Sequence, residues 1–282
     1  MSSYRMPRHP ANSAASPLLH GVDFTSAPRK AKGITIASGQ LIHDAFELQQ
    51  LQTFHDFSEF QRWLHIPGPW VAGFDFPFSL PRELITLLNW PTEWPALIQH
   101  YASLSREEIR NAFKAVCDSR AVGNKFIHRQ GDSAAGSSSS MKWVNPPVAY
   151  MLHAGAPLLL QAGVTIPCMH SGDSQRIALE AYPGMVARSI TRESYKSDTP
   201  SMQTPARRAA RLQIIKALEK AEHPYRIKLH TGTFRNQLLN DGSGDLLDAV
   251  LCAVLATWGW QRRDANYGLP AHDALEGWIV GA

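Results

Sequence analysis

The chain has 282 residues, 44% of them hydrophobic and 18% charged, so it can bury a large core and does not have the composition of a disordered protein. Its net charge of +4 and pI near 9.0 favour anionic partners mildly, which by itself does not identify a nucleic-acid-binding protein. The 3 cysteines are widely spaced and form no CxxC pair, which excludes a disulfide framework or a cysteine zinc site and makes the reducing cytoplasm the expected compartment.

Residues 1–16 are expected to form a flexible lead-in, because they are rich in Pro, Ser and Asn and lack the apolar run of a secretory signal. No later segment reaches the roughly 18 apolar residues that a membrane span needs, so no membrane partner is expected. Residues 17–282 are predicted to form one domain.

The first predicted strand covers residues 18–24 and carries a charged residue, Asp23, at the end of an apolar run. Two more predicted strands, 31–38 and 45–52, follow across short turns. This spacing predicts an antiparallel meander.

A helix and a second acid-ending strand follow the meander. Residues 56–64 have apolar positions on one helical face, with Asp56 and Glu59 at capping-box spacing. The strand predicted at 70–75 ends on Asp75. A crossover helix that returns this strand beside the first one would produce a mixed sheet.

The middle of the chain, about 82–145, is predicted to be a helical and Ser-rich insertion. Two or three helices are expected within 82–118, and the Gly and Ser cluster at 131–140 is expected to be a mobile loop. The remaining predicted elements are a helix at 148–162, strands at 164–166 and 176–182, a basic helix from 205 to about 222, and a buried helix at 244–260.

Acidic residues stand in apolar surroundings late in the predicted strands and at the start of the last helix: Asp23, Asp75, Glu180, Asp245 and Asp248. A buried carboxylate is costly unless it is paired or binds a cation. Carboxylates are the ligands that Mg²⁺ and Mn²⁺ prefer, and two such ions roughly 3.5–4 Å apart suit the attack of water on a phosphodiester. Converging acids would therefore predict a metal-dependent phosphoesterase.

Structural explanations compete with this hypothesis for each residue alone. Asp245 would favour the dipole of the helix that it begins, whereas Asp248 is harder to explain that way. Glu180 could pair with Arg188. It is the agreement of four separate stretches that favours a functional site.

The segments GVDFTSAPRKAKGI, AGFDFPFSLP, ALEAYPG and DLLDAVLCAVLATW, in this order, resemble the pattern of the DUF429 family of predicted nucleases. The resemblance spans about residues 18–280. It implies an α/β fold with an RNase H-like mixed sheet flanked by helices, and it leaves the insertion at 82–145 outside the minimal fold.

The resemblance also implies a divalent-metal-dependent nuclease that uses Mg²⁺ or Mn²⁺ and acts on nucleic acid or another phosphoester. Asp23 and Asp75 would take the central ligand positions. Glu180 would complete the catalytic set, together with the pair Asp245 and Asp248.

Basic residues offer weaker candidates for contacts with substrate phosphates. Arg29 and Lys30 follow Asp23 closely, and Lys125 and Arg129 lie next to the Ser-rich loop. The arginines of the basic helix are expected to form a solvated face.

Two other functions are consistent with the sequence. A catalytically inactive module with the same fold would bind nucleic acid or a protein partner, with salt-sensitive affinity and no need for a divalent ion. An ATP-using phosphotransferase would need a glycine-rich phosphate loop, and only Gly21 is available beside Asp23.

Overall fold

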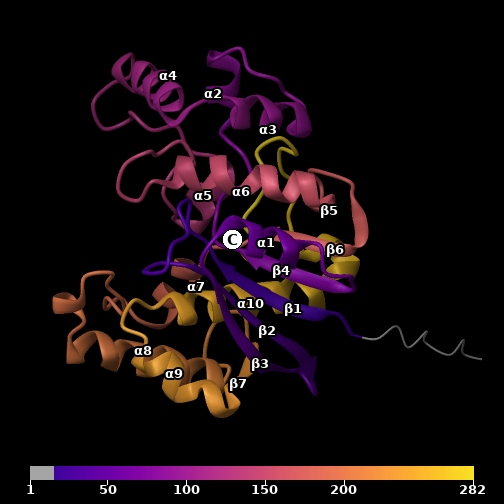
Figure 1. The fold of residues 1–282 in the computed structure, drawn as a ribbon, viewed down its shortest axis with the longest axis vertical. Helices are drawn as coiled ribbons and strands as arrows, with labels where there is room; N and C mark the ends of the chain where they lie inside the picture. The colour runs from indigo at the N-terminus through magenta and orange to yellow at the C-terminus, as the bar shows by residue number, and fades with distance from the viewer. Residues whose placement is uncertain (1–15) are drawn as a thin grey trace, which may run out of the picture.

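The computed structural model describes residues 16–282, so the expected lead-in at 1–16 lies outside the described residues apart from its last member. The fold is α/β, with a seven-stranded mixed sheet flanked by helices (Figure 1). The strands are β1 (Leu18–Asp23), β2 (Ile34–Ile42), β3 (Ala45–Phe54), β4 (Trp70–Phe74), β5 (Val164–Thr165), β6 (Asp173–Glu180) and β7 (Lys228–His230), in the spatial order β5-β6-β4-β1-β2-β3-β7.

The predicted helical regions are present, together with three further helices that were not predicted. The helices are α1 (Phe57–Leu64), α2 (Arg82–Leu87), α3 (Trp94–Ser103), α4 (Arg106–Asp118), α5 (Gln130–Ala135), α6 (Val148–Ala162), α7 (Pro183–Ile190), α8 (Pro205–Glu219), α9 (Arg235–Asn240) and α10 (Asp245–Gln261), of which α5, α7 and α9 were not predicted. Among the residues that the structure describes, no helix is long and apolar enough to cross a membrane.

The predicted meander and crossover are both present. β2 pairs antiparallel with β1 and with β3, and α1 then returns the chain so that β4 lies parallel to β1. The side chain of Asp56 caps α1 by accepting a hydrogen bond from the Glu59 backbone N–H at 2.9 Å. The Glu59 carboxylate accepts from His55 instead of from Asp56, so only half of the predicted capping box forms.

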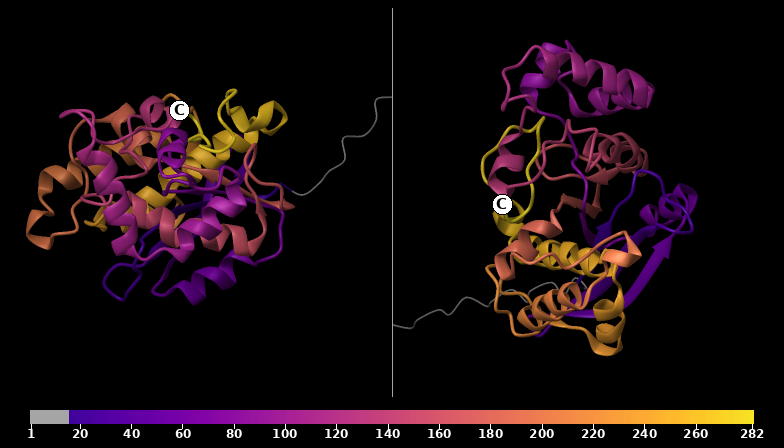
Figure 2. Two further views of the ribbon diagram at one scale, coloured as in Figure 1. Left: turned by 90° about the horizontal axis from the view of Figure 1, so that it is seen from above. Right: turned by 90° about the vertical axis from the view of Figure 1, so that its left-hand side faces the viewer.

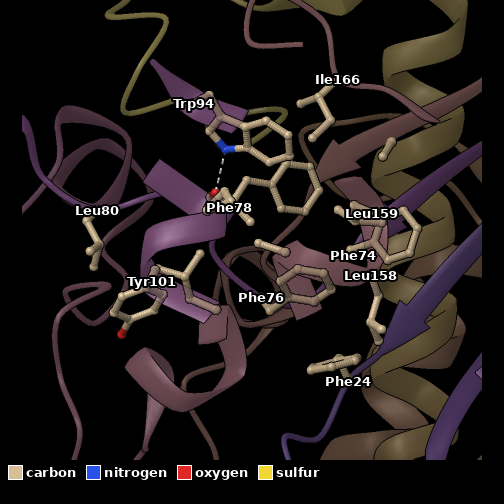
Figure 3. Close-up of a cluster of buried hydrophobic side chains, with 14 of the residues drawn as sticks. Phe24, Phe74, Phe76, Phe78, Leu80, Trp94, Tyr101, Leu158, Leu159 and Ile166 are labelled. Atoms are coloured by element: carbon tan, nitrogen blue, oxygen red, sulfur yellow. Dashed lines mark hydrogen bonds between the residues drawn. The ribbon is translucent and has the colours of Figure 1, made fainter. Parts of the chain in front are cut away.

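Two hydrophobic cores lie on opposite faces of the sheet. The first core packs Phe24, Phe74 and Phe76 against α1, α3 and α6, and Figure 3 shows its aromatic centre. There the Trp94 indole N–H donates to the Phe78 carbonyl at 2.9 Å. The second core joins the other face to α7, α8, α9 and the long buried helix α10 (Figure 2).

A Gly-x-Asp-Phe pattern occurs twice, at the ends of two neighbouring strands, and its residues face both sides of the sheet. Successive strand residues point to opposite faces, so Gly21 and Asp23 share the α10 face while Phe24 enters the first core. Gly73, Asp75 and Phe76 repeat this arrangement on β4, and the Phe24 and Phe76 rings lie 4.6 Å apart. Each acid is therefore followed by an aromatic anchor on the opposite face.

The predicted insertion contains α2, α3, α4 and α5, and the first three of these lie at the end of the molecule farthest from α8 and α9 (Figures 1 and 2). The capping box of Ser105 and Glu108 at the start of α4 is complete. The prediction of a mobile loop at 131–140 is wrong. This segment begins inside α5, and Ser139 and Ser140 are buried because they pack around the carboxylate of Asp132 and the Ile127 carbonyl.

The segment after α10 returns to the end of β6 and meets the insertion. Val280 N–H donates to the Glu180 carbonyl at 2.8 Å. The Glu276 carboxylate accepts from the backbone N–H of Arg82 at 2.8 Å and of Gln130 at 3.2 Å. Residues 273–282 thus join β6, α2 and α5.

Candidate active site

Asp23 and Asp75 stand at the same end of two neighbouring parallel strands. Val22 is in register with Phe74, and Asp75 N–H donates to the Val22 carbonyl at 2.9 Å. The two acids are the next residues along each strand, and neighbouring strands lie about 4.8 Å apart. Asp23 is 8% exposed and Asp75 is half-buried, so both carboxylates sit in an environment with little solvent.

Helix α10 packs directly on the sheet, and this packing places a third acid close to Asp23 and Asp75. A Cβ atom at Gly21 would be 2.0 Å from the Ala249 carbonyl oxygen, and one at Gly73 would be 2.6 Å from the Cys252 carbonyl oxygen. Only glycine allows this approach, which places the first turn of α10 over the strand ends. Asp248, in that turn, is 0% exposed.

The acids of α10 are held by lysines. Asp248 accepts hydrogen bonds from the Tyr195 hydroxyl and the Lys196 ammonium. Asp245 pairs with Lys32 at 2.7 Å, and the same ammonium group also contacts Asp198 at 2.7 Å. Asp23 and Asp75, in contrast, accept no side-chain hydrogen bond from any residue in the range 16–282.

The unpaired acids have raised pKa values. Burial, followed by the negative charges of Asp248 and Asp245, raises the pKa of Asp23 well above its ordinary value. Burial raises the pKa of Asp75 to about 7, and Lys196 opposes this rise. These mutual effects identify Asp23, Asp75, Asp245 and Asp248 as one acidic centre, with Lys196 beside it.

Glu180 is placed differently from the other predicted acids. It is in register with Phe74, so its side chain lies on the opposite face of the sheet from Asp75. There it forms a two-point ion pair with Arg129, at 2.8 and 2.5 Å, and accepts from the Phe78 N–H at 2.9 Å. The pairing with Arg188 considered from the sequence is wrong, since Arg188 contacts Tyr182 and the end of α5.

Arg129 does not offer a free guanidinium to a substrate. It is 1% exposed, and its side-chain N–H donors are used by Asp132, by Glu180 and by the Glu276 carbonyl. The expectation that Arg129 contacts a substrate phosphate at the surface is therefore wrong, because Arg129 is buried and its donors are already used, two of its three partners being distant in sequence. Arg29, Lys30 and Lys125 are exposed.

A pocket of about 320 Å³ opens beside Asp75 and connects the two groups of charges. Asp75 and Lys196 line one part of it, and the ion pair of Arg129 with Glu180 lines another. The remaining walls are mostly apolar, with the serines of the segment after α5. We refer to it as the Asp75 pocket.

No sequence pattern pointed to Lys196, Tyr195 or Lys32 as site residues. Tyr195 and Lys196 lie in a polar segment of ordinary composition, and a lysine is normally solvated. Only the packing of the connection between α7 and α8 across the start of α10 brings Tyr195 and Lys196 to Asp248.

Among residues 16–282, no three His, Cys, Asp or Glu side chains are placed to ligate one metal ion together. Mg²⁺, however, usually keeps several waters and is held by one or two carboxylates together with substrate phosphates. Asp23 and Asp75 fit this smaller requirement, because both offer carboxyl oxygens as ligands, lie side by side and accept no side-chain hydrogen bond within the described chain.

No family model matches the chain, and no curated protein or solved structure is similar enough to count as a relative. The functional argument therefore depends on the geometry of the acidic centre.

Proposed function

We propose that the protein is a divalent-cation-dependent phosphodiesterase, most simply a nuclease, on an RNase H-like sheet. The observation that carries the proposal is the buried Asp23 beside the half-buried Asp75, both without side-chain hydrogen-bond donors in the described chain. Stable proteins rarely bury unpaired carboxylates, and raised pKa values of this kind cluster at functional sites.

Topology and resemblance support the same proposal. The arrangement of β3, β2, β1, β4 and β6, with the antiparallel meander first and parallel strands after it, agrees with the element order that the resemblance to the DUF429 family implies. The site lies at the carboxyl ends of the parallel strands β1 and β4, where open α/β sheets bind their ligands.

In this proposal Asp23 and Asp75 would hold Mg²⁺ or Mn²⁺, which when bound would supply an activated water and neutralise charge on the phosphate. The protein positions the two carboxylates through glycines on one face of the sheet and phenylalanines on the other. The Asp75 pocket would admit the phosphate and the part of the substrate next to it.

The test is cleavage of labelled single- and double-stranded DNA and RNA, and of a bis-aryl phosphodiester, with Mn²⁺ present or removed by chelation. We expect cleavage by the wild type with Mn²⁺ only, and a loss of at least about 100-fold in Asp23→Asn and in Asp75→Asn. Asp44→Asn makes the same chemical change in an exposed turn and should cleave normally. Equal activity of Asp75→Asn and the wild type would refute the proposal.

A second candidate function is the catalytically inactive nucleic-acid or protein binding module. The observation that favours it is the Lys196 ammonium, which already neutralises Asp248 without any metal. This candidate predicts binding of oligonucleotides that weakens with salt, is insensitive to chelation and occurs without cleavage.

A further inference from the structure

Lys196 is held at the acidic centre from several sides. The preceding Tyr195 donates its hydroxyl hydrogen to Asp248, and its backbone carbonyl accepts from the buried Arg211 at 2.6 Å. Gly244 has a positive φ of 80°, and a Cβ atom there would be 2.6 Å from the Lys196 Cβ atom. The backbone at Lys196 is thus fixed against the start of α10.

The ammonium group of Lys196 faces several of the acids. It forms an ion pair with Asp248, which has no solvent exposure, and it lies close enough to Asp23 and Asp75 to influence both. Burial by itself would lower the pKa of Lys196, but the charge of Asp248 outweighs this and keeps the group protonated.

The ammonium group of Lys196 also has N–H donors that its contact with Asp248 does not use. Its side chain is 43% exposed and lines the Asp75 pocket. An ammonium group has three N–H donors, and the contact with Asp248 uses one of them. Lys32 differs in this respect, because it already contacts two carboxylates, Asp198 and Asp245, and lies outside the pocket.

We propose that Lys196 is a catalytic residue that serves as the second cation of the site, so that the protein uses a single divalent ion. This inference rests on the proposed function. Lys196 neutralises Asp248 and donates a hydrogen bond to a non-bridging oxygen of the substrate phosphate, while Asp23 and Asp75 remain for the ion. The substrate is then a phosphodiester whose phosphate reaches the Asp75 pocket.

The reaction is a simple hydrolysis, and Lys196 stays protonated throughout. A water oxygen forms a bond to phosphorus and gives its proton to solvent. The bond from phosphorus to the leaving oxygen breaks with its electron pair going to that oxygen, which takes a proton from solvent. The lysine lowers the barrier because its charge faces the negative charge that develops on the phosphate.

The experiment combines Mn²⁺ binding with kinetics on the full chain. Calorimetry counts the Mn²⁺ ions bound by the wild type, Lys196→Gln and Lys196→Arg, and cleavage of the best phosphodiester gives kcat and KM. Lys228→Gln is the matched control, because it removes the same charge from an exposed position on the edge strand β7.

We expect one Mn²⁺ per chain in the wild type. Lys196→Gln should bind Mn²⁺ about tenfold more tightly, because one positive charge fewer faces the ion, and its kcat should fall about 100- to 1,000-fold. Lys196→Arg keeps the charge and should keep at least about a tenth of the wild-type kcat, and Lys228→Gln should resemble the wild type.

Several results would overturn the inference while leaving the proposed function intact. These are two Mn²⁺ ions in an active wild type, an unchanged kcat in Lys196→Gln, or an arginine variant as slow as the glutamine variant. Weaker Mn²⁺ binding together with a lower melting temperature in Lys196→Gln would show a purely structural lysine. If the wild type neither binds Mn²⁺ nor cleaves, the proposed function fails together with this inference.

Discussion

Asp75 and Arg129 are two charged residues that differ in whether the protein supplies their hydrogen-bond partners. Arg129 is fully buried but has a protein acceptor for each of its side-chain N–H groups. Asp75 is half-buried beside Asp23, and neither carboxylate has a donor within residues 16–282. The first arrangement satisfies its charges internally, whereas the second leaves two oxygen ligands available.

The raised pKa of Asp75 predicts a pH-dependent cost to stability. In the unfolded chain Asp75 loses its proton near pH 3.8, whereas in the folded protein it does so at about pH 7. The folded state therefore holds the extra proton between these values, and the contribution of Asp75 to stability declines as the pH rises through this window. Asp75→Asn should accordingly raise the free energy of unfolding at pH 8 by roughly 0.5–2 kcal/mol and by much less at pH 4.

Urea unfolding of both proteins at pH 4, 6 and 8, in a chelator, measures this difference. Asp44→Asn, at an exposed turn, should show no such trend. A variant that is less stable than the wild type at pH 8 would mean that Asp75 has stabilising partners in the folded state.

At the scale of elements, the sequence predicted most of the sheet and its helices. Alternating strands, capping residues and prolines are local signals, and the meander, α1, β4, α6 and α10 follow them. The predictions of Asp23, Asp75 and Asp248 as members of one group also came from local patterns. Lys196 and the partner of Glu180 could not be predicted, because such pairs depend on tertiary contacts between segments 51 or more residues apart.

The contact of α10 with β1 predicts a strict requirement for glycine. In Gly21→Ala the new methyl group would meet the backbone of α10, with the Ala249 oxygen at 2.0 Å and the Ala253 nitrogen at 2.1 Å. Backbone atoms cannot turn aside as a side chain can, so the variant should lose about 3 kcal/mol or more of stability.

Gly131→Ala is the matched control, because its methyl group would have no neighbour closer than 3.4 Å. Chemical denaturation of both variants makes the comparison. If Gly21→Ala proved as stable as Gly131→Ala, α10 could not be packed on β1 as described.

At the scale of the whole molecule, the Arg129 network joins parts that are distant in sequence. It connects α5 of the insertion, the end of β6 and the segment at 273–282, through Glu180 and the Glu276 carbonyl. Glu276 also binds the first turn of α2. Ion pairs and hydrogen bonds, together with the hydrophobic contacts of the first core, therefore attach the insertion to the sheet.

Arg129→Ala should destabilise the protein by about 3–5 kcal/mol, because it leaves Glu180 and Asp132 buried without their counterion. Arg110→Ala, which breaks an exposed pair with Glu107 on α4, should cost no more than about 1 kcal/mol. Thermal melts give the comparison, and hydrogen exchange should report loss of protection in α5. A cost for Arg129→Ala as small as that for Arg110→Ala would show that the network contributes little.

The position of Glu276 near the far end of the described chain has a consequence for biosynthesis. Translation is vectorial, so the sheet, the insertion and α10 all leave the ribosome before residues 273–282 do. Until then Arg129 and Glu180 link α5 to β6, and the backbone N–H groups of Arg82 and Gln130 lack their acceptor. A nascent chain from which α10 has emerged but residues 273–282 have not would thus carry the acidic centre beside an unfinished pocket wall, because Ile279 is still missing from it.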